Sequence, residues 1–323
     1  MDATTNGPAA PPASPLDRPS GLGFFAVLLG LFAALGSAAQ ASSAALGLAW
    51  SELFALLLPA FIVAAGSNVQ PARALLLARR PAAGVVPLGA LIGGVSFVAA
   101  GSLMALESLL LPRRWLELFD VTRIFDRGPA EQVALGLGAA VLAPFCEEVA
   151  FRGWLLTALR TRHRAGVAIV ACGLLFALMH LDPVRFVALF ALGSLYGWLA
   201  FRSGSIWPSA AAHAVNNGLG VLIASRGAPE SSLAAAPAAA GQIAVTSSVV
   251  LLGAAGLLAL LANAYRQRTP APPPVSELVV RRDPAQAGGR FDAGRVPGLL
   301  VGLAVLGGAL LVPLLVLGHA ARR

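Results

Sequence analysis

Three otherwise apolar segments of the chain carry the side chains that could perform chemistry. They read VLAPFCEEVAFRGWLL, FALMHLDP and PSAAAHAVNNGLG. In chain order their polar residues are Glu147, Glu148, Arg152, His180, His213, Asn216 and Asn217. Charged and strongly polar residues are costly inside a membrane helix, so each one is a candidate functional residue.

These residue types suit hydrolysis. A glutamate can act as general base on water, and a histidine or an asparagine can stabilise the oxyanion that develops. One glutamate and two histidines, here Glu147, His180 and His213, equally form the ligand set of a catalytic zinc with an open position for water. Both interpretations stay open at the level of residue types. A thiol nucleophile at Cys146 is disfavoured, because nothing beyond the histidines would activate it.

Spacing places the residues on helix faces. Glu148 and Arg152 are four residues apart and can pair on one face, whereas Glu147 points about 100° away and stays free. His213 and Asn217 also share a face. Each motif has a structural alternative: an ion pair that locks two helices, an interfacial histidine at His180, or hydrogen-bonding residues between helices.

The composition indicates which elements position these residues. Hydrophobic residues make up 57% of the 323-residue chain and charged residues only 12%, against about 25% charged in soluble domains. Soluble, disordered and fibrous proteins are thereby excluded, and an all-α, polytopic transmembrane helical bundle in the cell membrane is predicted. The net charge of +8 comes from arginines between apolar runs, so we expect no nucleic-acid partner.

The hydropathy pattern predicts four regions. A disordered tail (1–20) precedes amino-terminal transmembrane helices with an interfacial segment (21–129). A catalytic core of four helices (130–224) is followed by carboxy-terminal helices with a Pro- and Arg-rich linker (225–323). The eight or nine predicted spans are 22–40, 44–66, 84–108, 131–158, 165–181, 185–202, 205–224, 243–264 and 297–318, with the interfacial helix at 113–127. The segments between the predicted spans carry more arginines on one side, and this bias favours an amino terminus on the inner side of the membrane.

Two further expectations concern depth and isolated residues. A hairpin centred near residue 163 would bring Glu147 and His180 to similar depth on facing helices. His180 and His213, however, would differ in depth by several ångströms at about 1.5 Å per residue, unless the helices tilt and the fifth runs short of the membrane face, or the predicted spans are shifted. Glu52 and Glu107 are interpreted as isolated helix-end or packing residues, and Cys146 and Cys172 as small buried hydrophobes.

Together the three motifs resemble a known family. EEVAFR (147–152), FALMH (176–180) and HAVNN (213–217) are similar, in the same order, to the EExxxR, FxxxH and HxxxN/B motifs of the CPBP intramembrane proteases. That family includes type II CAAX prenyl endopeptidases and bacteriocin-processing and self-immunity proteins. The resemblance covers about residues 130–224 and implies a catalytic site within a four-helix membrane core.

Carried over to this sequence, the resemblance implies a role for each residue. Glu147 with His180 would activate water, and His213 with Asn217 would stabilise the oxyanion. Glu148 and Arg152 would support that geometry. The family's metalloprotease label implies zinc or another divalent metal on Glu147, His180 and His213, and a metal-free glutamate mechanism is the alternative.

The sequence therefore predicts an intramembrane endopeptidase. Its expected partners are a peptide or membrane-protein substrate, prenylated or not, and the lipid bilayer. The alternatives are a catalytically silent membrane partner or self-immunity protein, and a transporter that uses the same residues as an ion path. A transporter is disfavoured because the chain shows no internal repeat.

Overall fold

The structure, a computed structural model, describes residues 20–32, 43–67, 69–125, 128–226 and 237–280. Helices joined by turns make up these residues, and no β-sheet forms among them. The predicted all-α class is confirmed. The predicted last span (297–318) and nearly all of the predicted tail lie outside the described residues.

The described helices follow one another in two groups. The first group is α1 (Ser20–Leu31), α3 (Ala44–Trp50), η2 (Ser51–Leu57), α4 (Leu58–Gly66), α5 (Pro71–Ala74), α6 (Val85–Ser108), α7 (Arg113–Leu118) and η3 (Val121–Phe125). The second group is α8 (Pro129–Leu137), η4 (Gly138–Leu142), α9 (Ala143–Glu147), η5 (Glu148–Leu155), α10 (Leu156–Arg160), α11 (Ala165–Met179), α12 (Phe186–Ser203), α13 (Trp207–Ala224), α14 (Pro237–Arg268) and α15 (Val275–Leu278).

Several of these elements are consecutive stretches of one helix. Residues 44–66 form one continuous helix, α3–η2–α4, and residues 129–160 form another, α8–η4–α9–η5–α10. We call the second helix the catalytic rod, because it carries three of the residues that the sequence analysis predicts to be catalytic. The segments η2, η4 and η5 are π-helical, a geometry that is rare and often found at functional sites.

The described residues contain five helices that are long and apolar enough to cross a membrane. They are Ala44–Gly66, Val85–Ser108, Pro129–Arg160, Phe186–Ser203 and Ala240–Arg268. The predicted count of eight or nine spans is therefore not confirmed. One reason is α11, whose 15 residues rise only about 23 Å at 1.5 Å each, short of a hydrocarbon core of about 30 Å.

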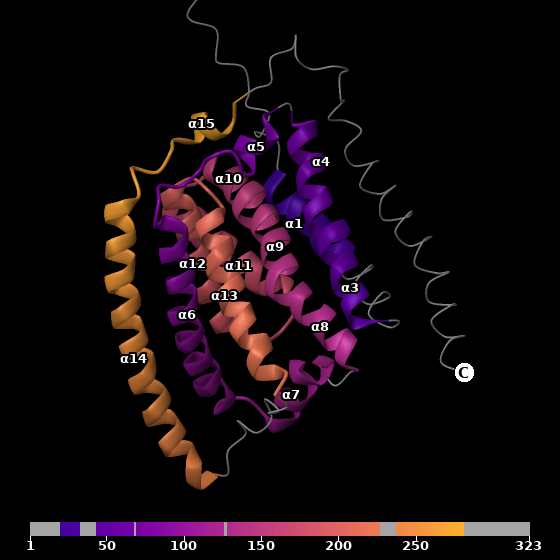
Figure 1. The fold of residues 1–323 in the computed structure, drawn as a ribbon, viewed down its shortest axis with the longest axis vertical. Coiled ribbons are helices and arrows are strands. Elements are labelled where there is room, and N and C mark those ends of the chain that lie inside the picture. The colour runs from indigo at the N-terminus through magenta and orange to yellow at the C-terminus, as the bar shows by residue number, and fades with distance from the viewer. Residues whose placement is uncertain (1–19, 33–42, 68, 126–127, 227–236, 281–323) are drawn as a thin grey trace, which may run out of the picture.

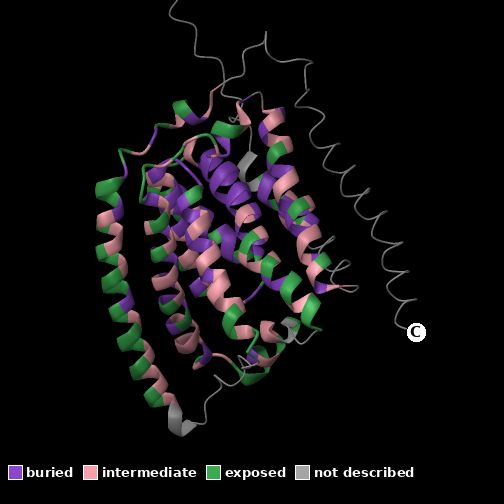
Figure 2. Ribbon diagram, viewed as in Figure 1, coloured by how far each residue is buried: buried purple, intermediate pink, exposed green. Residues whose placement is uncertain are grey.

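The catalytic rod lies at the centre of the bundle (Figure 1). Helices α11, α12 and α13 stand beside it, α6 packs against α13, and α14 packs on the outer side of α6. The continuous helix 44–66 covers the opposite flank, where η2 packs against α9. Buried residues concentrate in the rod and its neighbours, whereas α14 is largely exposed (Figure 2).

Glycines allow the helices that carry the site to approach closely. A Cβ at Gly93 on α6 would lie 2.1 Å from the carbonyl oxygen of Ala212 on α13, and a Cβ at Gly89 would lie 2.4 Å from that of Pro208. Small residues permit such backbone contact between membrane helices. The depth and rotation of α13, and hence of His213, depend on this contact.

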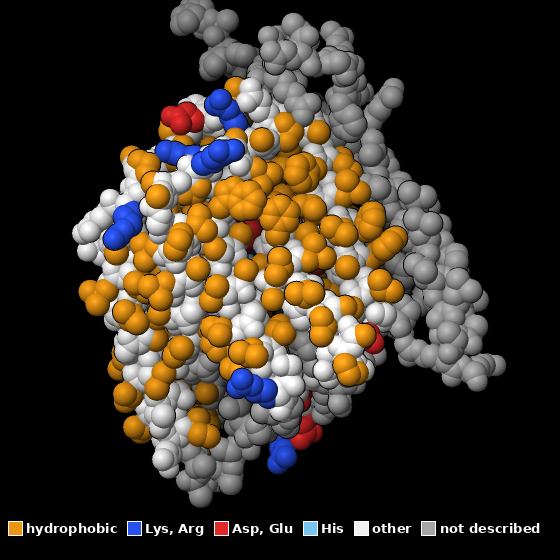
Figure 3. Space-filling view, in the orientation of Figure 1, with side chains coloured by type: hydrophobic (Ala, Val, Ile, Leu, Met, Phe, Trp, Pro, Cys, Tyr) orange, Lys and Arg blue, Asp and Glu red, His pale blue; other side chains and the backbone are white. Residues whose placement is uncertain are grey.

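The outer surface matches a bilayer environment. Hydrophobic side chains cover the face shown in Figure 3, and its arginines lie towards the two ends of the bundle. The segment predicted as interfacial folds as the short helices α7 and η3, with Trp115, Leu118 and Ile124 exposed. Short amphipathic elements of this kind suit the headgroup region.

Candidate active site

The catalytic rod carries three of the predicted residues on adjacent turns. The Nη1 atom of Arg152 lies 2.9 Å from Oε1 of Glu148, and both side chains are fully buried. The ion pair predicted from their spacing is confirmed. Arg152 also donates from Nη2 to the carbonyl oxygen of Gly193 on α12 (3.0 Å) and lies over the ring of Phe176, 4.4 Å from its centroid. The guanidinium therefore ties the rod to α11 and α12.

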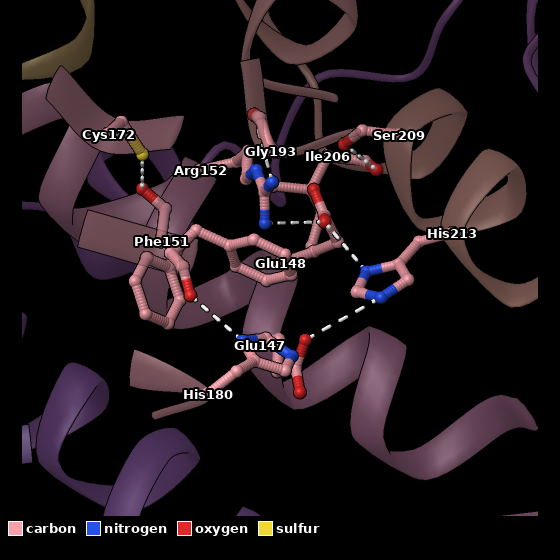
Figure 4. A network of polar contacts seen from close by, with 11 residues as sticks. Glu147, Glu148, Phe151, Arg152, Cys172, His180, Gly193, Ile206, Ser209 and His213 are labelled. Carbon is pink, nitrogen blue, oxygen red and sulfur yellow. Dashed lines mark hydrogen bonds and ion pairs between the residues drawn. The ribbon is translucent and has the colours of Figure 1, made fainter. Parts of the chain in front are cut away.

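His213 lies between the two glutamates (Figure 4). Its Nδ1 is 3.1 Å from Oε1 of Glu148, and its Nε2 is 3.6 Å from Oε2 of Glu147. The imidazole is buried, and its face packs on the ring of Tyr196 at a centroid distance of 5.0 Å. The contact between Glu148 and His213 was not predicted, because 65 residues separate the two in the chain.

His180 joins the same group from the end of α11. Its Nδ1 lies 2.9 Å from the carbonyl oxygen of Phe176. A carbonyl can only accept a hydrogen bond, so Nδ1 carries the proton and the neutral ring keeps a lone pair on Nε2. The side chain is exposed, and Figure 4 draws it on the same side of the cluster as Glu147.

The two histidines meet across one aromatic ring. The ring centroid of Phe176 lies 4.8 Å from that of His180 and 5.7 Å from that of His213. The two histidines therefore lie close together, although the predicted spans placed them at different depths, and α11 is shorter than the predicted span 165–181. It ends at Met179, and His180 is its carboxy-terminal cap.

Asn217 has a partner on the rod. Its Nδ2 donates to the carbonyl oxygen of Ala139 in η4 at 3.0 Å, which leaves a second N–H on the amide. The neighbouring Asn216 is buried, and its Nδ2 has no hydrogen-bond partner among the described residues. Both amides therefore retain a donor on the helix that carries His213.

The suitability of this site for a metal can be tested on its donors. His180 has the tautomer of a metal ligand, since Nδ1 is bonded to a carbonyl and Nε2 is free. In the part of the chain that the structure describes, however, no three His, Cys, Asp or Glu side chains are close enough to share one ion. The arrangement shown does not fit a three-ligand metal site, and zinc on Glu147, His180 and His213 stays a prediction.

Glu52 is a polar residue near the site whose position the sequence analysis missed. It lies inside the continuous helix 44–66, so the helix-end interpretation is wrong. The side chain is buried and interacts electrostatically with Glu147. The available signal was a lone carboxyl within an apolar run, the same signal that singled out the other three segments.

The remaining isolated residues are as expected. Glu107, at the end of α6, accepts a hydrogen bond from the backbone N–H of Val187 (3.0 Å). Cys146 and Cys172 are free and buried. Neither cysteine is placed in a disulfide.

The comparisons with known proteins agree with the motifs. Residues 129–219 match the family model described as type II CAAX prenyl endopeptidase Rce1-like. No curated protein and no solved structure matches the chain. The match covers all six predicted site residues and leaves Glu52 outside. At the level of the family it supports a CAAX-type endopeptidase in a membrane.

Proposed function

We propose that the chain is a multi-pass protease of the cell membrane that hydrolyses a peptide bond of a membrane-associated or prenylated peptide or protein. The observation that carries the proposal is the convergence of Glu147, Glu148, Arg152, His180 and His213 in one largely buried cluster. Within a low-dielectric site, such preorganised charges stabilise a transition state far better than they would in water.

The hydrogen bonds assign different tasks to the two histidines. His213 faces a carboxylate at each nitrogen, and in this proposal it acts with a proton on both nitrogens. Nδ1–H then donates to Glu148, whose charge is balanced by Arg152, and Nε2–H is available to a developing oxyanion. His180 donates from Nδ1 to the carbonyl oxygen of Phe176, so in its neutral form it can only accept a hydrogen bond at Nε2.

Glu147 is the base in this proposal. Its Oε2 makes no hydrogen bond within the described residues, so it is free to take a proton from water that His180 helps to orient. The activated water adds to the scissile carbonyl carbon. Nε2–H of His213 and the second N–H of Asn217 stabilise the oxyanion. The proton on Glu147 then passes to the leaving nitrogen as the C–N bond breaks.

The test is direct cleavage. The purified full-length chain, in detergent or lipid nanodiscs, is mixed with matched peptides that end in a CAAX sequence, with and without a prenyl group on the cysteine. Products are identified by mass spectrometry. Cleavage by the native chain that is absent from Glu147→Gln supports the proposal, and preference between the two peptides defines the substrate. Equal product from both proteins would overturn it.

A further inference from the structure

Glu52 is buried, and one of its carboxylate oxygens has no hydrogen-bond partner among the described residues. The residue is 2% exposed, and its Oε2 makes no hydrogen bond to any described residue. None of the described arginines or histidines forms an ion pair with it. A buried carboxyl without a donor is unfavourable, and in a membrane helix such a residue is a candidate functional residue.

The surroundings of Glu52 connect it to the catalytic cluster. The π-helical segment η2, which carries Glu52, packs against α9, which ends at Glu147. Glu52 interacts electrostatically with both Glu147 and Cys146. Two ionised carboxylates placed close together in a protein interior repel each other. Packing therefore gives no reason for an acid at position 52.

A pocket of about 770 Å³ lies between the same two helices. Its walls come from α3 on one side and from α8, η4 and α9 on the other. The lining residues are Ser43, Ala45, Leu46, Ala49, Glu131, Ala134, Leu137, Gly138, Val141, Leu142 and Phe145. Ala49 is one turn before Glu52, and Phe145 is two residues before Glu147. The mainly apolar pocket thus reaches the turns that precede both carboxyls.

We propose that Glu52 is a substrate-contacting residue that accepts a hydrogen bond from a backbone N–H of the bound peptide, while the adjoining apolar part of that peptide lies in the pocket. This inference rests on the proposed function. A peptide carries an N–H at nearly every residue, so it supplies the donor that Oε2 of Glu52 lacks among the described residues. The pocket is lined by Ala49 and Phe145, on the turns that precede Glu52 and Glu147, and this position favours the substrate as its occupant.

The test compares Glu52→Leu and Glu52→Gln in the full-length protein. Leucine removes the acceptor, so we expect KM for the cleaved peptide to rise about 10- to 100-fold, the cost of leaving a buried N–H of the peptide without an acceptor. The change in kcat should be smaller, and the melting temperature should be unchanged or higher, because an unpaired buried carboxyl is lost. Glutamine keeps a carbonyl acceptor and should restore most of the affinity.

A structural role would give the opposite pattern. If Glu52→Leu lowers the melting temperature, or leaves KM unchanged, the inference is wrong. Glu107→Leu is the matched control. It removes another acid that accepts a backbone hydrogen bond, and it should lower the melting temperature without changing KM.

The pocket is tested separately by Ala49→Phe, which fills it beside Glu52. We expect KM to rise for peptides with a large apolar group and to change less for short polar ones. If Ala49→Phe displaces a lipid that co-purifies with the native protein and leaves KM unchanged, the pocket binds lipid and the inference is wrong. Glu147→Gln separates a failure of the proposed function from a failure of the inference about Glu52. If Glu147→Gln abolishes cleavage while the Glu52 variants behave as native, only the role of Glu52 is wrong.

Discussion

The catalytic rod and helix α14 are both long apolar helices, yet they differ in how much of their surface is buried inside the protein. In the most apolar 18 residues of the rod, 44% of residues are buried inside the protein, against 11% in α14. The rod is continuous but contains π-helical segments, and it carries a fully buried ion pair. Helix α14 is a regular helix whose charges, Arg266 and Arg268, lie in its last turn.

The difference shows where a membrane protein can hold charge. Glu148 and Arg152 are surrounded by other helices and by each other, so neither faces lipid. Along α14, Val249, Leu252 and Leu260 are 64–73% exposed, and any charge there would meet hydrocarbon. The buried ion pair therefore lies in the helix that its neighbours enclose, and substitutions in the two helices should have very different effects.

The largest effect is expected at Glu147. Glu147→Gln removes the base but keeps the shape of the side chain, so the cleavage rate should fall about 10²- to 10⁴-fold. The melting temperature should stay close to the native value, because Oε2 of Glu147 has no hydrogen-bond partner among the described residues to lose. Rate and melting temperature are measured on the same preparation, and native activity in the variant would refute the assignment.

Arg152→Ala should have the largest effect on stability. It leaves the buried Glu148 carboxylate without its counter-ion, and breaking a buried pair costs roughly 3–5 kcal/mol. We expect low yield, a lower melting temperature and little activity. Arg113→Ala is the control, since its pair with Glu117 is exposed. If Arg152→Ala retains native stability, the guanidinium acts on the substrate instead.

Gly93→Ala should act through α13. The new Cβ would lie 2.1 Å from the carbonyl oxygen of Ala212, so α6 and α13 must separate. Overpacking of this kind costs about 1–3 kcal/mol, and the shift of His213 should lower kcat as well. The adjacent Gly94→Ala is the control, because its Cβ would meet only Val215 at 3.9 Å. Equal behaviour of the two variants would show that the contact does not position the site.

The smallest effects are expected on α14. Tyr265→Phe removes the hydrogen bond from the buried hydroxyl to the carbonyl oxygen of Leu199, a loss of about 0.5–1.5 kcal/mol. Leu252→Ala, on the exposed face, should change stability by less than about 0.5 kcal/mol. Cleavage rates should be native in both. A large loss of activity in either variant would show that α14 contributes to the site.

Much of the catalytic rod could be predicted from the sequence. The pair of Glu148 and Arg152 follows from their spacing on one helix, and the boundaries of the helix at 44–66 follow from hydropathy. The length of α11 could not be predicted from hydropathy, because the apolar run continues to Leu181 whereas the helix ends at Met179. Leu181 adopts a left-handed backbone (φ 51°), and Asp182 accepts the N–H of Val184 before α12 begins. Local backbone geometry and polar contacts therefore end the helix at a position where hydropathy predicts no helix end.

The sequence by itself determined the all-helical class, the membrane environment and the order of the three motifs, because these depend on composition and on residues close together in the chain. Only the tertiary structure decided which carboxylate faces each nitrogen of His213 and that the helix of Glu52 packs against the segment that ends at Glu147. Those relations depend on the rotation and crossing of helices. Contacts such as that of Gly93 with Ala212 set them, between residues more than a hundred positions apart in the chain.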